Sequence, residues 1–393
     1  MNASARVLTA VLLAVSPLLA APPAAATDLC TRPAEPYPGR PWALQRVLLD
    51  ELWQQATGKG VTVAVVDSGV DDRHPQLAGA VDSARGAVLV RGAGADPTVD
   101  LSGHGTRVAG VIAARPARGT GFTGLAPGAT IVPVRQVDAE GDGDARTLAA
   151  AVDHARRIGA DVINVSQDTP HALAVDPALD RAVRAALDDG IVVVASAGND
   201  GLGGAVRPTY PASIPGVLAV AAADRNNERA AFSQSGDFVD VAAPGVGITS
   251  TVPGGGHCTA DGTSFAAPYV AGVAALLVEK HPDWGQERIA EHIRRTAERS
   301  VAGRDRLVGW GVVDPVRALT EDETPLNAPP GHEGVITARA PDITPSGHER
   351  ATREAGRRLA AYVLVGGVAL LATVTGGTVA LRDARRRRDP RRR

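Results

Sequence analysis

Short runs of β-branched and other apolar residues recur through the middle of the chain, at 61–69, 129–137, 160–166, 190–198 and 216–222. Such runs are typical of strands that are buried on both faces of a parallel sheet. Helical patterns separate several of them, at 147–158 and 179–187. This alternation predicts an α/β fold, an open, doubly wound and mostly parallel sheet with helices on both faces. Because ligands of such sheets bind beyond the carboxyl ends of the strands, we expect the chemistry directly after these runs.

The composition excludes several classes of protein. The chain of 393 residues is 44% apolar, which suffices for a core and excludes a disordered or collagen-like chain. Aromatic residues make up only 3%, which disfavours a stacking surface for single-stranded nucleic acid. Residues 382–393 hold eight Arg and two Asp, a net charge of +6, so the formal charge of −2 leaves −8 for the rest. We therefore expect no nucleic-acid partner.

Both ends of the chain look like targeting segments. Residues 1–26 combine Arg6, an apolar run and three final alanines, as a secretory signal peptide does. Residues 360–381 are 22 residues without a charge, enough for a helix to cross a hydrocarbon core of about 30 Å. Eight Arg follow this segment and three closely precede it, which favours a cytoplasmic C-terminus. We expect a single-pass protein of the cell membrane with its bulk extracytoplasmic.

These segments define the expected domain organisation. An N-terminal extension at 27–57 precedes the folded body at 58–320. Residues 321–359 are rich in Pro, Gly and charged residues and predict a flexible stalk. The transmembrane helix at 360–381 and a basic cytoplasmic tail at 382–393 follow.

The chain has two cysteines, Cys30 in the extension and Cys258 in the body. On the oxidising side of a membrane an even pair favours a disulfide over a metal site. Two unpaired cysteines that pack as small apolar residues are the alternative. Since the sequence contains no HExxH motif and no His/Cys cluster, we expect neither a metal nor a cofactor.

Polar residues stand where the fold predicts chemistry. Asp67 and Asn199 follow apolar runs, and His104 lies in GHGTRVAG. Ser264 lies in a Gly-Thr-Ser turn that opens a helix of about 15 residues, and we expect Pro268 in the first turn of that helix, where it is tolerated. A serine at a helix N-terminus has free backbone N–H groups and the positive end of the helix dipole beside it. These are the features that an oxyanion site requires.

The contexts VVDSGV, GHGTRVAG and GTSFAAPYVAG, in this order, resemble the subtilisin-like serine proteases (subtilases) over about residues 58–318. The resemblance implies that Ser264 is the nucleophile and that His104 is its general base and acid. It implies further that Asp67 orients His104 and that Asn199 donates to the oxyanion. Taken alone, Asp67 and Asn199 also fit turn residues, and Ser264 fits a plain helix N-cap.

The same resemblance implies a substrate-binding region that includes Ser166, Gln167 and Asp168, together with Ser196, Ala197 and Gly198. Ser166-Gln167-Asp168 stands where subtilases usually have Ser-Leu-Gly, so ordinary subtilisin preference is not expected. The extension is too short for an independently folding prodomain, because domains below roughly 40 residues rarely fold unaided. We expect it to wrap onto the body.

The accessory segments narrow the resemblance. A subtilase body with a signal peptide, a stalk and a C-terminal anchor is similar to the mycosins, membrane-anchored subtilases of type VII secretion systems. This implies a serine endopeptidase that processes a protein substrate of such a system and supports its membrane complex. The alternative is a protein that acts mainly as a scaffold or assembly factor of that complex, with proteolysis secondary.

Overall fold

The computed structural model describes residues 30, 32–90, 94–138, 143–167, 175–202, 206–299, 303–321 and 379. All of these except Val379 belong to one compact unit that ends at Pro325. The signal peptide predicted at 1–26 lies outside the described residues, as do the stalk beyond Glu321, the basic tail and, except for Val379, the segment 360–381. Within the described ranges, no helix has both the length and the apolar character needed to cross a membrane.

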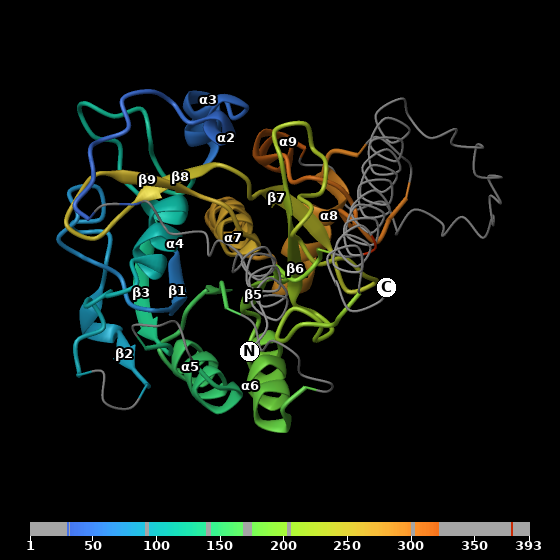
Figure 1. The fold of residues 1–393 in the computed structure, drawn as a ribbon. Helices are drawn as coiled ribbons and strands as arrows, with labels where there is room; N and C mark the ends of the chain where they lie inside the picture. The colour runs from blue at the N-terminus through green and yellow to red at the C-terminus, as the bar shows by residue number, and fades with distance from the viewer. Residues whose placement is uncertain are drawn as a thin grey trace, which may run out of the picture. The chain divides into compact units, whose positions relative to one another are not determined.

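A parallel sheet forms the centre of the unit (Figure 1). Seven described strands pair in the order β2-β3-β1-β4-β5-β6-β7, and every pairing between them is parallel. Their bounds are β1 Thr62–Asp67, β2 Ala87–Val88, β3 Thr130–Arg135, β4 Val162–Val165, β5 Val192–Ser196, β6 Leu218–Ala223 and β7 Val241–Pro244. The order reverses at β1, where the chain winds first to one side and then to the other, as the doubly wound prediction requires.

Helices cover both faces of the sheet. Side chains alternate along β1, so Val63 and Val65 pack into one core and Ala64 and Val66 into another. The first core contains α4 (His104–Ala113), α7 (Thr263–Lys280) and α8 (Gln286–Thr296). The second contains α5 (Ala145–Arg157) and α6 (Pro177–Asp188), which lie together on the opposite side of the sheet in Figure 1.

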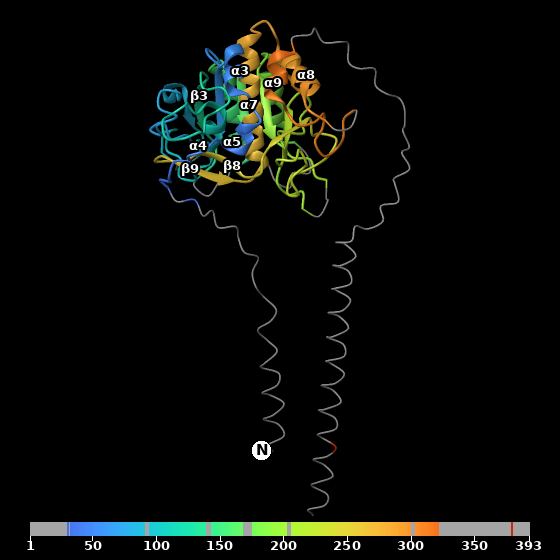
Figure 2. The same ribbon diagram turned by 90° about the horizontal axis from the view of Figure 1, so that it is seen from above.

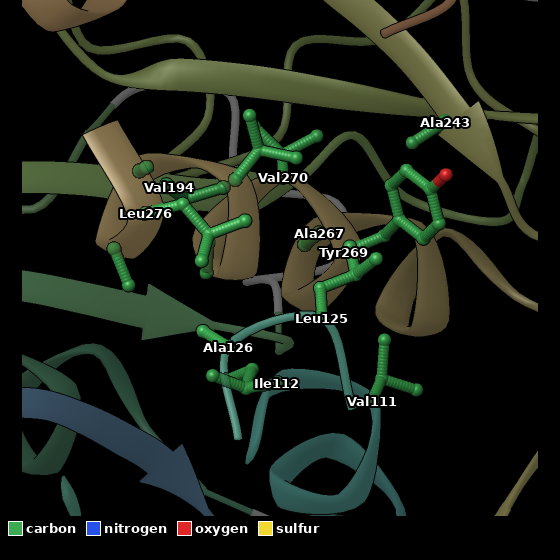
Figure 3. Packing of buried hydrophobic residues seen from close by; sticks show 14 of the residues in the cluster. Val111, Ile112, Leu125, Ala126, Val194, Ala243, Ala267, Tyr269, Val270 and Leu276 are labelled. Atoms are coloured by element: carbon green, nitrogen blue, oxygen red, sulfur yellow. The ribbon is translucent and has the colours of Figure 1, made fainter. Parts of the chain in front are cut away.

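Helix α7 is the central helix of the first core. Val194 of β5 lies on one side of the helix, near Leu276, and Val111 and Ile112 of α4 lie on the other side (Figure 3). The helix starts at Thr263, so Pro268 is its sixth residue and lies in the second turn. Our expectation of a first-turn proline was therefore wrong. In the second turn a residue normally donates its N–H to the carbonyl four residues earlier, here that of Ser264, and Pro268 has no N–H to donate.

The extension packs on the same side of the sheet as α7. Its helices are α2 (Trp42–Gln45) and α3 (Leu49–Gln55), and α3 contacts α9 (Pro315–Thr320) near the other end of the described body (Figures 1 and 2). Trp42 donates from Nε1 to the Val246 carbonyl (3.0 Å), and Trp53 donates to the Leu125 carbonyl (2.9 Å). An antiparallel hairpin, β8 (Ile248–Thr251) and β9 (His257–Ala260), lies over α4. The extension thus contacts residues far from it in sequence.

Candidate functional site

Asp67 is the last residue of β1, at the carboxyl edge of the sheet where the strand order reverses. Its side chain is fully buried. One carboxylate oxygen accepts from the backbone N–H of Ser68 (2.8 Å), and the two oxygens lie 2.8 and 2.9 Å from Nδ1 of His104. A carboxylate can only accept here, so Nδ1 of His104 carries the hydrogen and Nε2 is left as the basic nitrogen.

His104 is the first residue of α4, and a second carboxylate holds that helix end. The preceding Gly103 has a left-handed backbone (φ 75°) and provides no side-chain cap. Asp100 takes over the capping: it accepts from the N–H groups of Gly103 and Thr106 (2.8 Å each) and from the Thr106 hydroxyl (2.6 Å). The negative charge also complements the positive end of the helix dipole.

Ser68 connects the two carboxylates. Its hydroxyl donates to Asp100 (2.8 Å) and accepts from the N–H of Gly105 (3.0 Å), the residue after His104. Gly105 approaches the chain so closely that a Cβ would lie 2.1 Å from the Gly69 carbonyl oxygen. The backbone directly after His104 is therefore held in place as well as its ring. Asp100 and Ser68 are positioning residues that the sequence analysis did not identify.

The electrostatics of His104 follow from this arrangement. Burial of the ring lowers its pKa, but the charge of Asp67 and the hydrogen bond to it raise the pKa more. The pKa of His104 therefore lies above its ordinary value of 6.5. A carboxylate partner within hydrogen-bond distance favours the imidazolium, the form that a general base reaches after it accepts a proton.

Ser264 is the second residue of α7 and is 8% exposed. The next residue, Phe265, packs its ring 5.3 Å from the ring of His104, so the serine and the histidine lie in the same region. Gly262 precedes the helix with φ +156°, and a Cβ there would lie 2.8 Å from the Ser264 oxygen. Only glycine leaves this hydroxyl unobstructed.

Asn199 follows β5, and its side chain is oriented by the start of α7. Its Oδ1 accepts from the backbone N–H of Thr263 (2.9 Å) and from the Thr263 hydroxyl (3.1 Å). The same hydroxyl accepts from the N–H of Gly198 (3.2 Å). Oδ1 is thus occupied, and none of the described residues is shown to accept from Nδ2, so Nδ2 is the donor that the Asn199 amide can offer, beside the residue that precedes Ser264. Thr263 is a further positioning residue that the sequence analysis passed over.

The expected substrate-binding residues lie at the ends of two neighbouring strands, β4 and β5, which pair in parallel. Ser166 is buried, and its hydroxyl accepts from Asn164 (2.9 Å), while Gln167 is half-buried. Asp168 lies outside the described residues. On the β5 side, Ser196, Ala197 and Gly198 are buried. The carbonyl of Ala197 accepts from the Thr209 hydroxyl (2.9 Å), and that of Gly198 from the N–H of Gln234 (2.8 Å).

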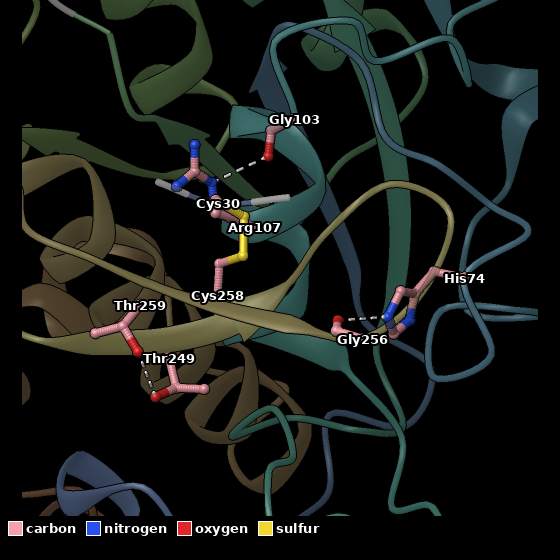
Figure 4. The surroundings of a disulfide bond; sticks show 8 residues. All are labelled: Cys30, His74, Gly103, Arg107, Thr249, Gly256, Cys258 and Thr259. Atoms are coloured by element: carbon pink, nitrogen blue, oxygen red, sulfur yellow. Dashed lines mark hydrogen bonds between the residues drawn. A yellow bond between two sulfur atoms is a disulfide. The ribbon is translucent and has the colours of Figure 1, made fainter. Parts of the chain in front are cut away.

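The disulfide between Cys30 and Cys258 is present, with the two Cα atoms 5.8 Å apart (Figure 4). It joins the extension to β9, on the side of α4 that carries Arg107. Arg32 donates from its guanidinium to the Leu101 carbonyl (2.9 Å), and a Cβ on Gly103 would meet the same guanidinium. The start of the extension therefore lies against the loop that leads into His104.

The described residues contain no group of three or more His, Cys, Asp or Glu side chains placed to hold a metal ion. The arrangement is suited to acyl transfer, in which a serine hydroxyl is activated by a carboxylate-bound histidine.

Comparisons with known proteins agree with this arrangement. Residues 58–311 match the subtilase family, peptidase S8. Subtilisin Savinase from Lederbergia lenta is 40% identical over 276 residues, which cover 70% of this chain and 96% of that protein.

Solved structures of mycosin proteases are also similar. MycP1 from Mycobacterium smegmatis is 32% identical with a TM-score of 0.67, and the match covers 77% of this chain and 91% of that protein. The serine protease MycP1 described as an essential component of the type VII (ESX-1) secretion system is 33% identical with a TM-score of 0.66. That match covers 73% of this chain and 90% of the other. The chain therefore belongs to the subtilase family and is a subtilisin-like serine peptidase.

Proposed function

We propose that the protein is a membrane-anchored, extracytoplasmic serine endopeptidase that processes a protein substrate of a type VII secretion system. The peptidase activity in this proposal is supported above all by the hydrogen-bonded pair Asp67–His104. The pair lies beside the N-terminus of α7, where Ser264 lies. These three residues have the types, the chain order and the local geometry of a nucleophile, a base and an orienting acid.

These groups can together catalyse the hydrolysis of a peptide bond in two stages, acylation and deacylation of Ser264. The Ser264 oxygen attacks the peptide carbonyl carbon while Nε2 of His104 accepts the hydroxyl proton. The carbonyl oxygen becomes an oxyanion, which the backbone N–H of Ser264 and Nδ2 of Asn199 stabilise. His104 then gives its proton to the departing amine and an acyl-enzyme remains. Water, deprotonated by His104, attacks the ester, and the proton returns to Ser264.

The substrate lies along the ends of β4 and β5 in this proposal. Extended peptides pair with exposed strand backbone, and side-chain positions beside that backbone set the preference. Gln167 flanks the proposed cleft on the β4 side. Because Gln167 is longer and more polar than the Leu that subtilases usually have there, we propose that the preferred residue before the cleaved bond differs from that of subtilisin.

The proposed setting rests on two kinds of support. The apolar segment 360–381, the basic tail and the leader at 1–26 support a single-pass anchor with the peptidase outside and the C-terminus inside. The similarity to MycP1, which is named as a component of a type VII secretion system, supports the partner complex. Protease added to wall-free cells would digest the body and spare a C-terminal tag if this topology holds.

Ser264→Ala tests the catalytic part. The change removes one oxygen near the start of a helix, so the melting temperature of the variant should stay close to that of the wild type. We expect it to lose peptide-bond cleavage and labelling by a fluorophosphonate probe, because no other group here replaces the Oγ nucleophile. Labelling that persists at the wild-type rate would refute the assignment of Ser264.

The alternative function is that of a scaffold for the secretion complex. The disulfide-anchored extension and the hairpin form a surface that does not depend on the nucleophile. Secretion that fails when the whole protein is deleted but continues with Ser264→Ala would assign the main role to the scaffold. Secretion that stops with both would assign it to proteolysis.

A further inference from the structure

Residues 32–41 of the extension, which lead into α2, form a segment that we call the strap. It runs along the β8–β9 hairpin: the N–H of Ala34 donates to the Gly255 carbonyl (3.0 Å), and the N–H of His257 donates to the Glu35 carbonyl (3.2 Å). The Thr120 hydroxyl donates to the Tyr37 carbonyl (2.7 Å). The strap is thus held mainly through its backbone.

His257 lies beneath the strap and is 9% exposed. Its Nδ1 accepts from the backbone N–H of Tyr37 (3.0 Å), and its Nε2 lies 2.6 Å from Oε1 of Gln76. The Gln76 amide nitrogen donates to the carbonyls of Arg115 (2.7 Å) and Phe122 (2.9 Å), so the oxygen is the atom that faces the histidine. Nε2 of His257 must therefore carry the hydrogen.

His74 has the same pattern of partners and is 2% exposed. Its Nδ1 accepts from the backbone N–H of Gln76 (3.1 Å), and its Nε2 lies 3.1 Å from the Gly256 carbonyl (Figure 4). The centroids of the two imidazole rings are 6.0 Å apart. Gln76 bridges the rings, contacting one through its backbone and the other through its side chain.

These contacts require both rings to be neutral. A backbone N–H can only donate, so each Nδ1 must keep its lone pair. A proton added to Nδ1 of His257 would point at the N–H of Tyr37 and break the contact to the strap. Two charged rings 6.0 Å apart with little solvent between them would also repel each other.

The charged neighbours do not supply a counter-ion bound to either ring. The charge of Asp71 raises the pKa of His74, but the oxygens of Asp71 accept from the N–H of Gly254 (2.7 Å) and from Arg73. The Arg115 guanidinium donates to the carbonyls of Ala78 and Gly79, and Glu35 is exposed on the strap. Burial lowers the pKa of His257 to about 4, with the charge of His74 acting in the same direction, and burial lowers the pKa of His74.

We propose that His74, Gln76 and His257 form an acid-labile clasp, and that protonation of the histidines releases the strap from the hairpin. This device goes beyond peptide-bond cleavage and does not depend on it. The disulfide holds one end of the strap, and Trp42, through Val246, holds the other. Release therefore frees a tethered loop beside the active site and uncovers the backbone of the hairpin.

The test measures amide hydrogen exchange of the full-length chain carrying Ser264→Ala, which prevents self-cleavage, from pH 7 to pH 4.5. Rates are corrected for the intrinsic effect of pH. We expect protection of the strap amides to fall by up to about tenfold per pH unit below pH 6.5, while α7 stays protected. His257→Asn removes the charge but can still accept from Tyr37, so it should keep the strap protected at pH 4.5.

His154→Gln is the matched control, because His154 lies on α5 and bonds only to the Arg85 carbonyl (2.8 Å) within the described residues. It should behave as the wild type does. If His257→Asn does not fold, His74→Gln replaces it with the same expected result. The proposal is overturned if the strap loses no more protection than α7, if the histidine variants and the control lose it equally, or if nitrogen NMR finds either clasp ring charged at pH 6.

Discussion

In two histidine sites of the structure, the ring atom Nδ1 has opposite roles in its hydrogen bond. In the catalytic region, Nδ1 of His104 donates to the carboxylate of Asp67, and the pKa of His104 is raised. In the clasp, Nδ1 of His257 accepts from a backbone N–H, and burial lowers the pKa of that ring to about 4. His74 follows the clasp pattern.

The difference shows that burial alone does not determine the charge of a histidine. Burial lowers the pKa at all three rings, and only the ring with a carboxylate partner ends above its ordinary value. The consequences for stability have opposite signs. The contribution of His257 is complete above pH 6.5 and is lost as the pH falls toward 4, whereas that of His104 is complete below pH 6.5 and is lost as the pH rises through its raised pKa.

Asp67→Asn should have the largest effect, because it gives His104 the hydrogen-bond pattern of the clasp. An Asn amide that donates to Nδ1 moves the ring hydrogen to Nε2, which can then no longer accept the serine proton. We expect kcat/KM to fall by about 10⁴-fold. We also expect the pKa of His104 to drop below 6.5, so the acid limb of the residual pH–rate profile shifts to lower pH. Strap protection should not change, and a variant with wild-type kcat/KM would contradict the assigned tautomer.

Asn199→Leu should have the next largest effect, since it removes the proposed oxyanion donor and leaves both histidine sites intact. We expect kcat to fall by roughly 10²- to 10³-fold with little change in KM. Thr263→Val keeps Asn199 but removes the hydroxyl that orients its amide, so we expect a smaller loss, about tenfold. Steady-state kinetics on one peptide substrate compares the two. A greater loss from Thr263→Val would contradict the positioning role.

Gln76→Leu should affect the clasp alone. It leaves His257 Nε2 and two backbone carbonyls without their partner, so we expect the free energy of unfolding at pH 7 to fall by about 3 kcal/mol. We expect kcat/KM at pH 7.5 to change by less than about twofold. Gln45→Leu is the control, because Gln45 is exposed on α2 and its side chain makes one hydrogen bond to the described residues, to the Arg40 carbonyl. Equal losses in denaturant titrations of the two variants would show that the clasp adds no stability.

The periodic parts of the fold were predictable from local pattern. The apolar runs at 61–69, 129–137, 160–166 and 190–198 contain β1, β3, β4 and β5, and the run at 216–222 contains all of β6 except its last residue. Strand β2 was missed because it is only two residues long. Strand β7, with the sequence VAAP, was missed because it has one β-branched residue and ends at a proline. The helix at Ser264 was expected, but its start was not, because a helix boundary depends on packing as well as on capping residues.

In the site, the sequence motifs pointed to Asp67, His104 and Ser264, but not to the residues that hold them. Asp100 and Ser68 are 32 positions apart, and no motif joins them. Thr263 stands beside Ser264, yet its role depends on the position of Asn199, which is 64 positions away. These contacts exist only because the carboxyl ends of the strands and the starts of α4 and α7 meet.

The sequence by itself determined the alternation of strands and helices, the edge of the sheet where polar residues gather, and the chemical types available there. These depend on side-chain periodicity and on local backbone preferences, which act over a few residues. The tertiary structure decided which histidine donates and which accepts, because His104 folds against a carboxylate and His257 against a backbone N–H from position 37. A ring nitrogen responds to the group placed within about 3 Å of it, and for these histidines that group lies at least 37 residues away in the chain.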